Sequence, residues 1–287
     1  STNPISRRDF MHEPNPISLA AKASGEPTFR EIGVGPWARV HPGEPRPDDP
    51  QSPNYDTRYD GELLDEGDRR NVLDRYRYWT VDAIKADLDA RGRHGFEVAV
   101  ENWTHDFNIG SMVRTANAFA ARRVHIVGPH KWNRKGALMT ELYQHVEYHP
   151  SIDELITSWR AGIAAEIADC EVQLAQLTLD PSHPDFGHEC IPDLAMQRVE
   201  VRERLRVLRE ARIIALDIIP GAVPIETYRF PERCLMLFGA EGPGLSEKAV
   251  SMADDVVYIS QFGSVRSINA GAAAAVAMHC WIAQRAM

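Results

Sequence analysis

An apolar strand runs straight into a glycine-rich loop in the segment Leu235-Met236-Leu237-Phe238-Gly239-Ala240-Glu241-Gly242-Pro243-Gly244-Leu245-Ser246. Glycines at such a junction let backbone N–H and C=O groups approach a ligand more closely than side chains would allow. The loop is not a P-loop, because no Lys-Ser/Thr pair follows the last glycine. Its spacing also differs from the dinucleotide pattern G-x-G-x-x-G. Taken alone, the segment is equally compatible with a plain β-turn.

Two further segments have the same order of strand, polar loop and small-residue helix. One is His105-Asp106-Phe107-Asn108-Ile109-Gly110-Ser111-Met112-Val113-Arg114-Thr115-Ala116-Asn117-Ala118-Phe119, and the other is Val257-Tyr258-Ile259-Ser260-Gln261-Phe262-Gly263-Ser264-Val265-Arg266-Ser267-Ile268-Asn269. We expect the Asn108 side chain to cap the first helix and Ser267 to cap the second, with Asn269 facing a ligand. Ordinary caps and a surface arginine at 114 would explain each segment separately.

The rest of the chain between these segments alternates short apolar runs with helical periodicity. Strand, helix and strand within about 30 residues indicate a βαβ unit, and therefore an α/β fold with a parallel sheet. The strands are expected at 96–100, 124–127, 213–216, 234–238 and 256–259. The helices are expected at 72–90, 109–120, 152–167, 199–212 and 269–284.

Composition places the chain among ordinary globular proteins. It has 287 residues, of which 44% are hydrophobic and 25% charged, and a formal net charge of −9. The acidic balance counts against nucleic-acid binding, although a local basic face can coexist with it. No apolar run approaches the roughly 20 residues that cross a bilayer, and no signal peptide is recognisable. The four cysteines form no C-x-x-C pair, so reduced thiols and a cytoplasmic location are expected.

Composition also suggests a domain organisation. Residues 1–60 are rich in proline and lack a hydrophobic period, so an extended or partly disordered N-terminal arm is expected. A helical N-terminal extension over 61–94 should follow, and then the α/β domain over 95–287.

The three segments together resemble the SpoU (TrmH-like) branch of the SPOUT superfamily of RNA ribose 2′-O-methyltransferases. The resemblance covers about residues 95–285. The family's first motif, Asn-x-Gly…Arg-Thr-Ala, corresponds to Asn108, Gly110, Arg114, Thr115 and Ala116; its second, Gly-x-Glu-Gly-x-Gly-Leu, to Gly239, Glu241, Gly242, Gly244 and Leu245; and its third, Ser-Leu-Asn, to Ser267, Ile268 and Asn269. A single motif would be weak, but three in register are specific.

The resemblance implies a Rossmann-like SPOUT fold with a C-terminal deep trefoil knot and S-adenosylmethionine as cofactor. It implies RNA, either tRNA or rRNA, as substrate, and a homodimer as the active unit. Relative to the compact family core, the segment at about 164–212 reads as a helical insertion. The chain departs from the third motif at Ser260 and Gln261, where the family usually has proline and an aliphatic residue, and at Ile268.

The resemblance also assigns roles to individual residues. The catalytic candidates are Arg114, Asn108, Glu241, Ser267 and Asn269; the cofactor-binding candidates are Gly239, Ile259, Ile268, Gly242 and Gly244. Arginine stays protonated in proteins. We therefore expect Arg114 to clamp an RNA phosphate and stabilise the developing alkoxide, rather than to act as a base. Glu241 is expected to hold Arg114 or to offset the positive charge of the cofactor.

Several alternatives remain open at this point. The arginines between 198 and 212 could supply a basic face, but a solvated helix with intrahelical ion pairs explains them as well. No metal is expected, because the spacing of Cys170, His183, His188 and Cys190 matches no standard zinc pattern. A non-catalytic knotted RNA-binding protein and a base-modifying SPOUT enzyme are the competing functions.

Overall fold

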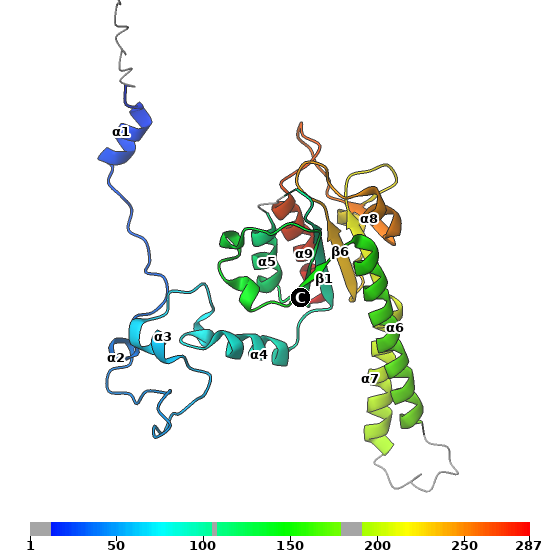
Figure 1. The fold of residues 1–287 in the computed structure, drawn as a ribbon, viewed down its shortest axis with the longest axis horizontal. Helices are drawn as coiled ribbons and strands as arrows, with labels where there is room; N and C mark the ends of the chain where they lie inside the picture. The colour runs from blue at the N-terminus through cyan, green and yellow to red at the C-terminus, as the bar shows by residue number, and fades with distance from the viewer. Residues whose placement is uncertain (1–12, 105–107, 179–190) are drawn as a thin grey trace, which may run out of the picture. The chain divides into compact units, whose positions relative to one another are not determined.

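The computed structural model describes residues 13–104, 108–178 and 191–287 (Figure 1). The chain divides into two compact units, one made of residues up to 55 together with 61–78, and the other of residues 56–60 together with 79–287. Within the described residues, no helix is both long enough and apolar enough to cross a membrane. The domain boundaries expected at residues 60 and 94 stay predictions.

The smaller unit is organised around a buried carboxylate. Asp68 is fully buried, and its side chain accepts hydrogen bonds from the Arg70 guanidinium at 2.9 and 2.8 Å and from the Tyr78 N–H at 2.9 Å. Its backbone pairs with that of Val34. The unit contains the short helices α1 (Pro16–Ala23), α2 (Trp37–Val40), α3 (Gly61–Glu66) and η1 (Asp74–Tyr76).

The helix expected over 72–90 is shorter in the structure. Only α4 (Val81–Arg91) forms, and the Thr80 side chain caps it by accepting from the Ala83 N–H at 3.2 Å. Tyr78 has a φ of 66°, which an α-helix cannot accommodate. That residue and the Thr80 cap explain why residues 72–80 do not continue the helix.

The larger unit is built on a seven-stranded, fully parallel sheet with the order β3-β2-β1-β6-β4-β7-β5. The strands are β1 (Phe96–Glu101), β2 (Val124–Val127), β3 (Val146–His149), β4 (Arg212–Leu216), β5 (Val223–Pro224), β6 (Cys234–Phe238) and β7 (Asp255–Tyr258). The expected α/β fold with a parallel sheet is therefore confirmed. The five expected strands are present, whereas β3 and β5 were not foreseen. The knotted threading stays a prediction.

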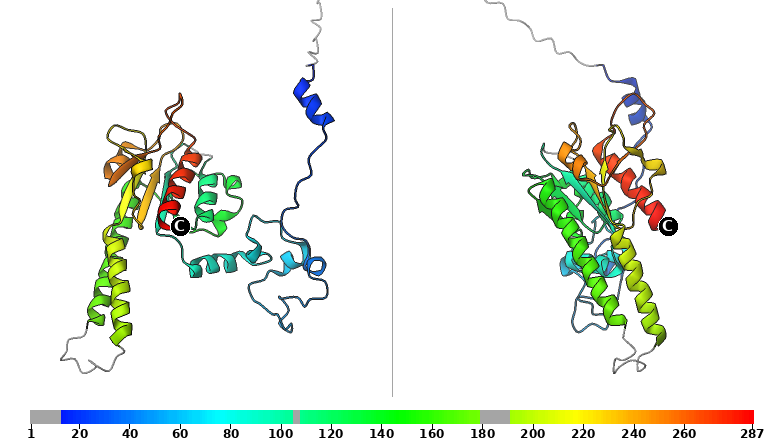
Figure 2. Two further views of the ribbon diagram at one scale, coloured as in Figure 1. Left: turned by 180° about the vertical axis from the view of Figure 1, so that it is seen from behind. Right: turned by 90° about the vertical axis from the view of Figure 1, so that its right-hand side faces the viewer.

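Helices cover both faces of the sheet, as Figures 1 and 2 show. Alternate residues of each central strand enter opposite cores: Met236 packs on one side, Leu235 and Leu237 on the other. The first core includes α5 (Ile109–Ala118) and α9 (Ala270–Arg285); the second includes α6 (Ile152–Leu177), α7 (Ile191–Arg209) and α8 (Glu247–Met252). Burial on both faces explains why these strands read as continuous apolar runs.

Helices α6 and α7 lie side by side and extend away from the sheet (Figures 1 and 2). The segment expected to be a helical insertion, 164–212, thus contains the second half of α6 and all of α7; its status as an insertion stays a prediction. Arg206 pairs with Glu203 and Glu210 of its own helix, at 2.6 and 2.7 Å. Arg209 pairs with Glu171 of α6 at 3.1 Å. These contacts favour the solvated-helix interpretation over a free basic face.

Candidate functional site

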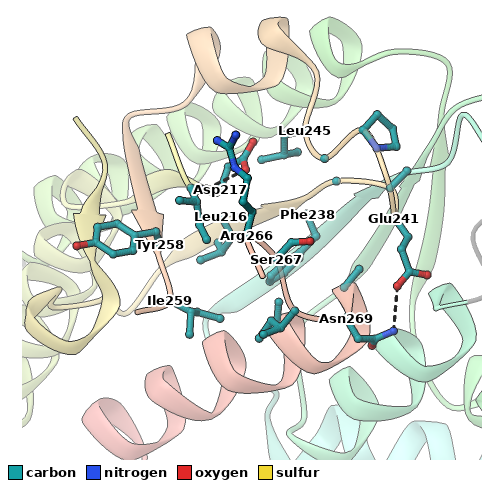
Figure 3. A pocket seen from close by; sticks show the side chains of 18 of the residues that line it. Leu216, Asp217, Phe238, Glu241, Leu245, Tyr258, Ile259, Arg266, Ser267 and Asn269 are labelled. Carbon is teal, nitrogen blue, oxygen red and sulfur yellow. Dashed lines mark hydrogen bonds between the residues drawn. The ribbon is translucent and has the colours of Figure 1, made fainter. Parts of the chain in front are cut away.

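A cavity of about 530 Å³ lies beyond the carboxyl ends of β4, β6 and β7 (Figure 3). Open parallel sheets bind ligands at this edge, because the loops that leave the strands diverge there and leave a crevice. The lining comes from residues 216–218, 238–245, 257–259, 261, 266–270 and 273. The second and third sequence motifs therefore meet around one cavity, although they are separate in sequence.

The glycine-rich loop folds back tightly on the end of β6. The Gly244 N–H donates to the Ala240 carbonyl at 3.1 Å, and the two residues form an isolated bridge. A Cβ on Gly239 would lie 2.1 Å from the Gly244 carbonyl carbon, so no side chain fits at this position. Gly242 and Gly244 have φ values of 98° and 72°, which favour glycine. The loop geometry thus depends on the three glycines that the sequence identified.

The cavity combines an apolar floor with polar groups at its rim. Phe238 and Leu245 are buried and Ile259 is half-buried, whereas the middle of the glycine loop, residues 241–243, is exposed. Asp217 directly follows β4, and its carboxylate accepts from the Ile218 N–H at 2.8 Å. A carboxylate, backbone amides and apolar walls form a lining suited to an amphipathic small molecule.

The rim holds a network of three polar side chains from three segments. The Asn108 amide donates to Glu241 at 2.8 Å, and the Asn269 amide donates to Asn108 Oδ1 at 2.9 Å and to Glu241 at 3.2 Å. The bond between Asn269 and Glu241 is drawn in Figure 3. We call Asn108, Glu241 and Asn269 the rim network. It joins one residue from each of the three motifs.

Close packing of two helix starts makes this network possible. Gly271 lies in the first turn of α9, where a Cβ would come within 2.6 Å of Ser111 Oγ and 3.2 Å of Asn269 Oδ1. Because Gly271 has no side chain, the beginnings of α5 and α9 can approach closely. The first motif is brought to the other two by this packing, which involves α5 residues outside the cavity lining.

The capping roles expected from sequence are wrong. The Asn108 side chain makes no cap hydrogen bond to α5, because its amide is engaged by Glu241 and Asn269. The start of α9 is capped by Asn269, whose Oδ1 accepts from the Ala272 N–H at 3.0 Å, and not by Ser267. Asn269 thus caps its helix with the oxygen and reaches the rim network with the nitrogen.

Arg114 lies one turn into α5 with an exposed side chain. Ser111 precedes it by three residues, so the two share a helix face, and Ser111 borders the start of α9. Among the residues that the structure describes, none forms an ion pair or side-chain hydrogen bond with Arg114. Glu241 accepts hydrogen bonds from Asn108 and Asn269. Its expected role, to hold Arg114 or to offset the positive charge of the cofactor, stays a prediction.

Eight of the ten predicted site residues line the cavity. They are Gly239, Glu241, Gly242, Gly244, Ile259, Ser267, Ile268 and Asn269. Asn108 reaches the cavity only through the rim network, and Arg114 lies outside the lining. The sequence interpretation assigned no role to Asp217, which a search for polar residues directly after each strand would have found.

The departure at Ser260 has a structural counterpart. The Ser260 N–H and hydroxyl both donate to the Glu226 carboxylate, at 3.1 and 2.9 Å. A proline at 260 would lack the N–H and would lose one of these bonds. Gln261 closes the following loop by donating to the Arg266 carbonyl at 3.1 Å. The unusual residues therefore hold the loop that contributes Arg266 and Ser267 to the cavity.

Comparison with known proteins agrees with this arrangement. Residues 187–279 match the model of the SpoU rRNA Methylase family. This C-terminal part of the chain is similar to the SpoU methylases. The match includes the second and third motifs, whereas the first motif, at 108–116, precedes it.

Individual relatives cover only parts of the chain. A tRNA (guanosine(18)-2′-O)-methyltransferase of Saccharomyces cerevisiae is 28% identical over 112 residues, which are 36% of this chain and 8% of the yeast protein. Among solved structures, the SpoU methyltransferase AviRb of Streptomyces viridochromogenes with AdoMet matches at a TM-score of 0.43 and 21% identity, covering 68% of this chain and 59% of that one. The TrmH/SpoU tRNA modifying enzyme of A. aeolicus matches at 0.46 and 15%, covering 72% and 82%.

Proposed function

We propose that this chain transfers a methyl group from S-adenosylmethionine to a ribose 2′-hydroxyl of tRNA or rRNA. The observation that carries the proposal is the rim network, in which Asn108, Glu241 and Asn269 come together at the mouth of the glycine-loop cavity. A plain turn or an ordinary helix cap has no need of this three-way arrangement. The match of residues 187–279 to the SpoU family supports the same activity.

The cavity suits the proposed cofactor in size and chemistry. Its volume of about 530 Å³ lies within the roughly 300–1,000 Å³ usual for small-molecule sites. Phe238, Ile259 and Ile268 offer apolar surface to an adenine ring, and the glycine loop offers backbone hydrogen-bonding groups. Asp217 offers a carboxylate to a hydroxyl or an ammonium group. S-adenosylmethionine bound there supplies an electrophilic methyl group on a sulfonium.

The residues of the chain supply positioning and charge. Transfer to a hydroxyl needs the reacting atoms in line, so orientation provides much of the rate. Arg114 clamps the RNA phosphate by charge-assisted hydrogen bonds and stabilises negative charge developing on the ribose oxygen. Asn108, Ser267 and Asn269 orient the ribose. Glu241 holds the two asparagine amides and places a carboxylate beside the cationic cofactor.

RNA is the substrate class, and a homodimer that binds RNA across both subunits is the proposed active unit. The location proposed is cytoplasmic. The arginines of α7 are not required for this model, because Arg206 and Arg209 already pair with glutamates.

The direct test is transfer of labelled methyl from S-adenosylmethionine to unmodified tRNA and rRNA, tested separately and followed by nucleoside analysis. A labelled 2′-O-methylnucleoside supports the proposal and identifies the RNA class. A labelled base would instead indicate a base-modifying enzyme. Absence of both transfer and cofactor binding would favour a non-catalytic RNA-binding protein.

The cofactor site has its own test, with two glycines as a matched pair. Gly239→Ala places a methyl group against the Gly244 backbone, so calorimetry should show at least about tenfold weaker S-adenosylmethionine binding, equal to about 1.4 kcal/mol. Gly263→Ala meets no atom within 4 Å and should bind as the unchanged protein does. Equal affinities in the two variants would contradict the assignment of the cavity.

A further inference from the structure

A second polar cluster lies at the β3 edge of the sheet. Strand β1 separates β2 and β3 from β6, β4 and β7, whose ends form the cavity. In the parallel pairing of β2 with β3, His125 is the register partner of Glu147. Side chains two residues apart on a strand point to the same face. His149 therefore joins His125 and Glu147 on one face, and α6 begins immediately after β3.

Both imidazoles are buried. In each ring, the nitrogen that faces away from the other ring lies against a carboxylate. His125 Nε2 lies 2.9 Å from Glu97 Oε1, and His149 Nδ1 lies 2.5 Å from Glu154 Oε2. Glu97 is itself buried, and its other oxygen accepts from the Trp159 indole N–H at 2.7 Å.

The inner nitrogens of the two rings face each other. His125 Nδ1 and His149 Nε2 are 2.8 Å apart. A carboxylate only accepts, so the outer nitrogen of each ring carries the hydrogen. A neutral imidazole has one N–H, which leaves lone pairs on both inner nitrogens. Two lone pairs at this distance repel unless a cation lies between them.

The Glu147 carboxylate supplies a third possible metal ligand. Glu147 Oε2 lies 3.6 Å from His125 Nδ1 and 3.9 Å from His149 Nε2, while its other oxygen is 3.1 Å from Arg123. Metal–ligand bonds of about 2.0–2.2 Å at tetrahedral angles require ligand atoms about 3.3 Å apart. The triangle sides of 2.8, 3.6 and 3.9 Å bracket this separation. The three atoms also form the one candidate metal group among the described residues.

We propose that His125 Nδ1, His149 Nε2 and Glu147 Oε2 bind a divalent transition-metal ion of the Zn²⁺ type. Glu97 and Glu154 then act as the outer carboxylates that orient metal-bound histidines. The Glu147 side chain is 47% exposed on the edge strand, so the ion can enter there and keep a water ligand. The metal ties the edge strand β3 to β2 and to the start of α6. This proposal departs from the absence of metal expected from sequence spacing.

The test uses the tag-free, full-length protein, stripped with chelator and titrated with Zn²⁺ against a chromophoric competitor. We expect one Zn²⁺ per chain at this site and a raised Tm, because a ligand that binds only the folded state stabilises it. X-ray absorption should show two imidazole nitrogens and oxygen ligands. No binding at micromolar Zn²⁺ would overturn the proposal and leave a shared proton between the imidazoles as the explanation.

Variants distinguish Zn²⁺ binding at this site from Zn²⁺ binding at other histidines or cysteines of the chain. His149→Gln should weaken Zn²⁺ binding at least about 100-fold, and Glu97→Gln about 10- to 100-fold through the outer shell. Because the Glu147 side chain is half-exposed, Glu147→Gln should leave folding intact. This variant should weaken Zn²⁺ binding about tenfold. The matched control is His145→Gln, whose ring pairs with Asp89 at 2.9 Å and should not alter binding. Equal affinity in the His149 and His145 variants would contradict the assignment.

Discussion

Two polar networks on the same sheet differ in where their charges lie. The rim network of Asn108, Glu241 and Asn269 is at the carboxyl ends of the strands, and two of its three members are exposed. The cluster around Glu97 and His125 is buried beneath α6. Exposed groups retain solvent and can exchange partners with a ligand, whereas buried groups must be satisfied within the fold. The comparison predicts that the rim serves activity and the buried cluster serves stability.

The largest expected effect comes from breaking the buried cluster. Glu97→Ala removes the carboxylate that pairs with His125 and Trp159 and should lower the free energy of unfolding by about 3–5 kcal/mol. Denaturant titration measures this loss. Glu97→Gln, which keeps the shape and one acceptor, is the control and should lose less. If Glu97→Ala and Glu97→Gln both caused equally small losses in the free energy of unfolding, burial would not give this cluster a larger role in stability than the rim network.

Arg114→Ala gives the next largest effect, on activity alone. Loss of one charge-stabilising group should reduce methyl transfer by about 100- to 1,000-fold, or about 3–4 kcal/mol in the barrier. The side chain is exposed, so cofactor affinity and Tm should stay unchanged. Arg202→Ala, an exposed arginine on α7, is the matched control. Strong residual transfer in the Arg114 variant would remove it from the reaction.

Asn269→Ala sharpens the comparison because this residue has both kinds of role. Losing the cap of α9 should cost about 1 kcal/mol of stability, measured as a lower denaturation midpoint. Losing the bonds to Asn108 and Glu241 should also reduce methyl transfer. Asn269→Ser keeps a capping oxygen and should restore stability without restoring full activity. Parallel recovery of both properties would mean that the residue acts only as a cap.

The smallest effect is expected at the opposite ends of the strands. Asp255 accepts from Arg212 at 2.7 and 2.9 Å and from the Tyr228 hydroxyl at 2.7 Å. Hydrogen bonding by Arg212 holds the pKa of the Asp255 carboxyl below its ordinary value. Its stabilisation is therefore present above the unfolded-state pKa of about 3.9 and is lost as pH falls through the lower folded-state pKa.

Asp255→Asn should cost about 1 kcal/mol near neutral pH, because Arg212 is half exposed and solvent screens the pair. The difference from the unchanged protein should vanish in strong acid, where the carboxyl is protonated in both states. Methyl transfer should not change at neutral pH, since this pair lies away from the cavity. Denaturation at several pH values checks the stability part, and a loss of transfer would contradict the division between the two strand ends.

The fold was predictable where the signal is local. The runs at 213–216 and 234–238 are apolar on both faces and became β4 and β6. The edge strand β3 was missed because its Val-Glu-Tyr-His sequence is half exposed and lacks an apolar run. The two-residue β5 offers no period to detect. The helix before Val81 was overestimated because the pattern gave no sign of the positive φ at Tyr78.

The candidate site divides in the same way. The need for glycine at 239, 242 and 244 follows from local backbone geometry, so the motif showed it directly. The motif could not reveal the hydrogen-bond partners of Asn108, because Glu241 and Asn269 lie 133 and 161 residues away in the chain. A capping role was the local option for Asn108, and long-range hydrogen bonds replaced it.

By itself, the sequence determined the strand-loop-helix junctions and the glycine loop, because periodicity and backbone conformation are properties of neighbouring residues. Only the tertiary structure decided which strands are neighbours, and with them which polar groups meet. The pairing of β2 with β3 places His125 opposite Glu147, and the packing of α9 on α5 joins Asn269 to Asn108. Register and helix packing are set by burial across the whole sheet, which no local pattern contains.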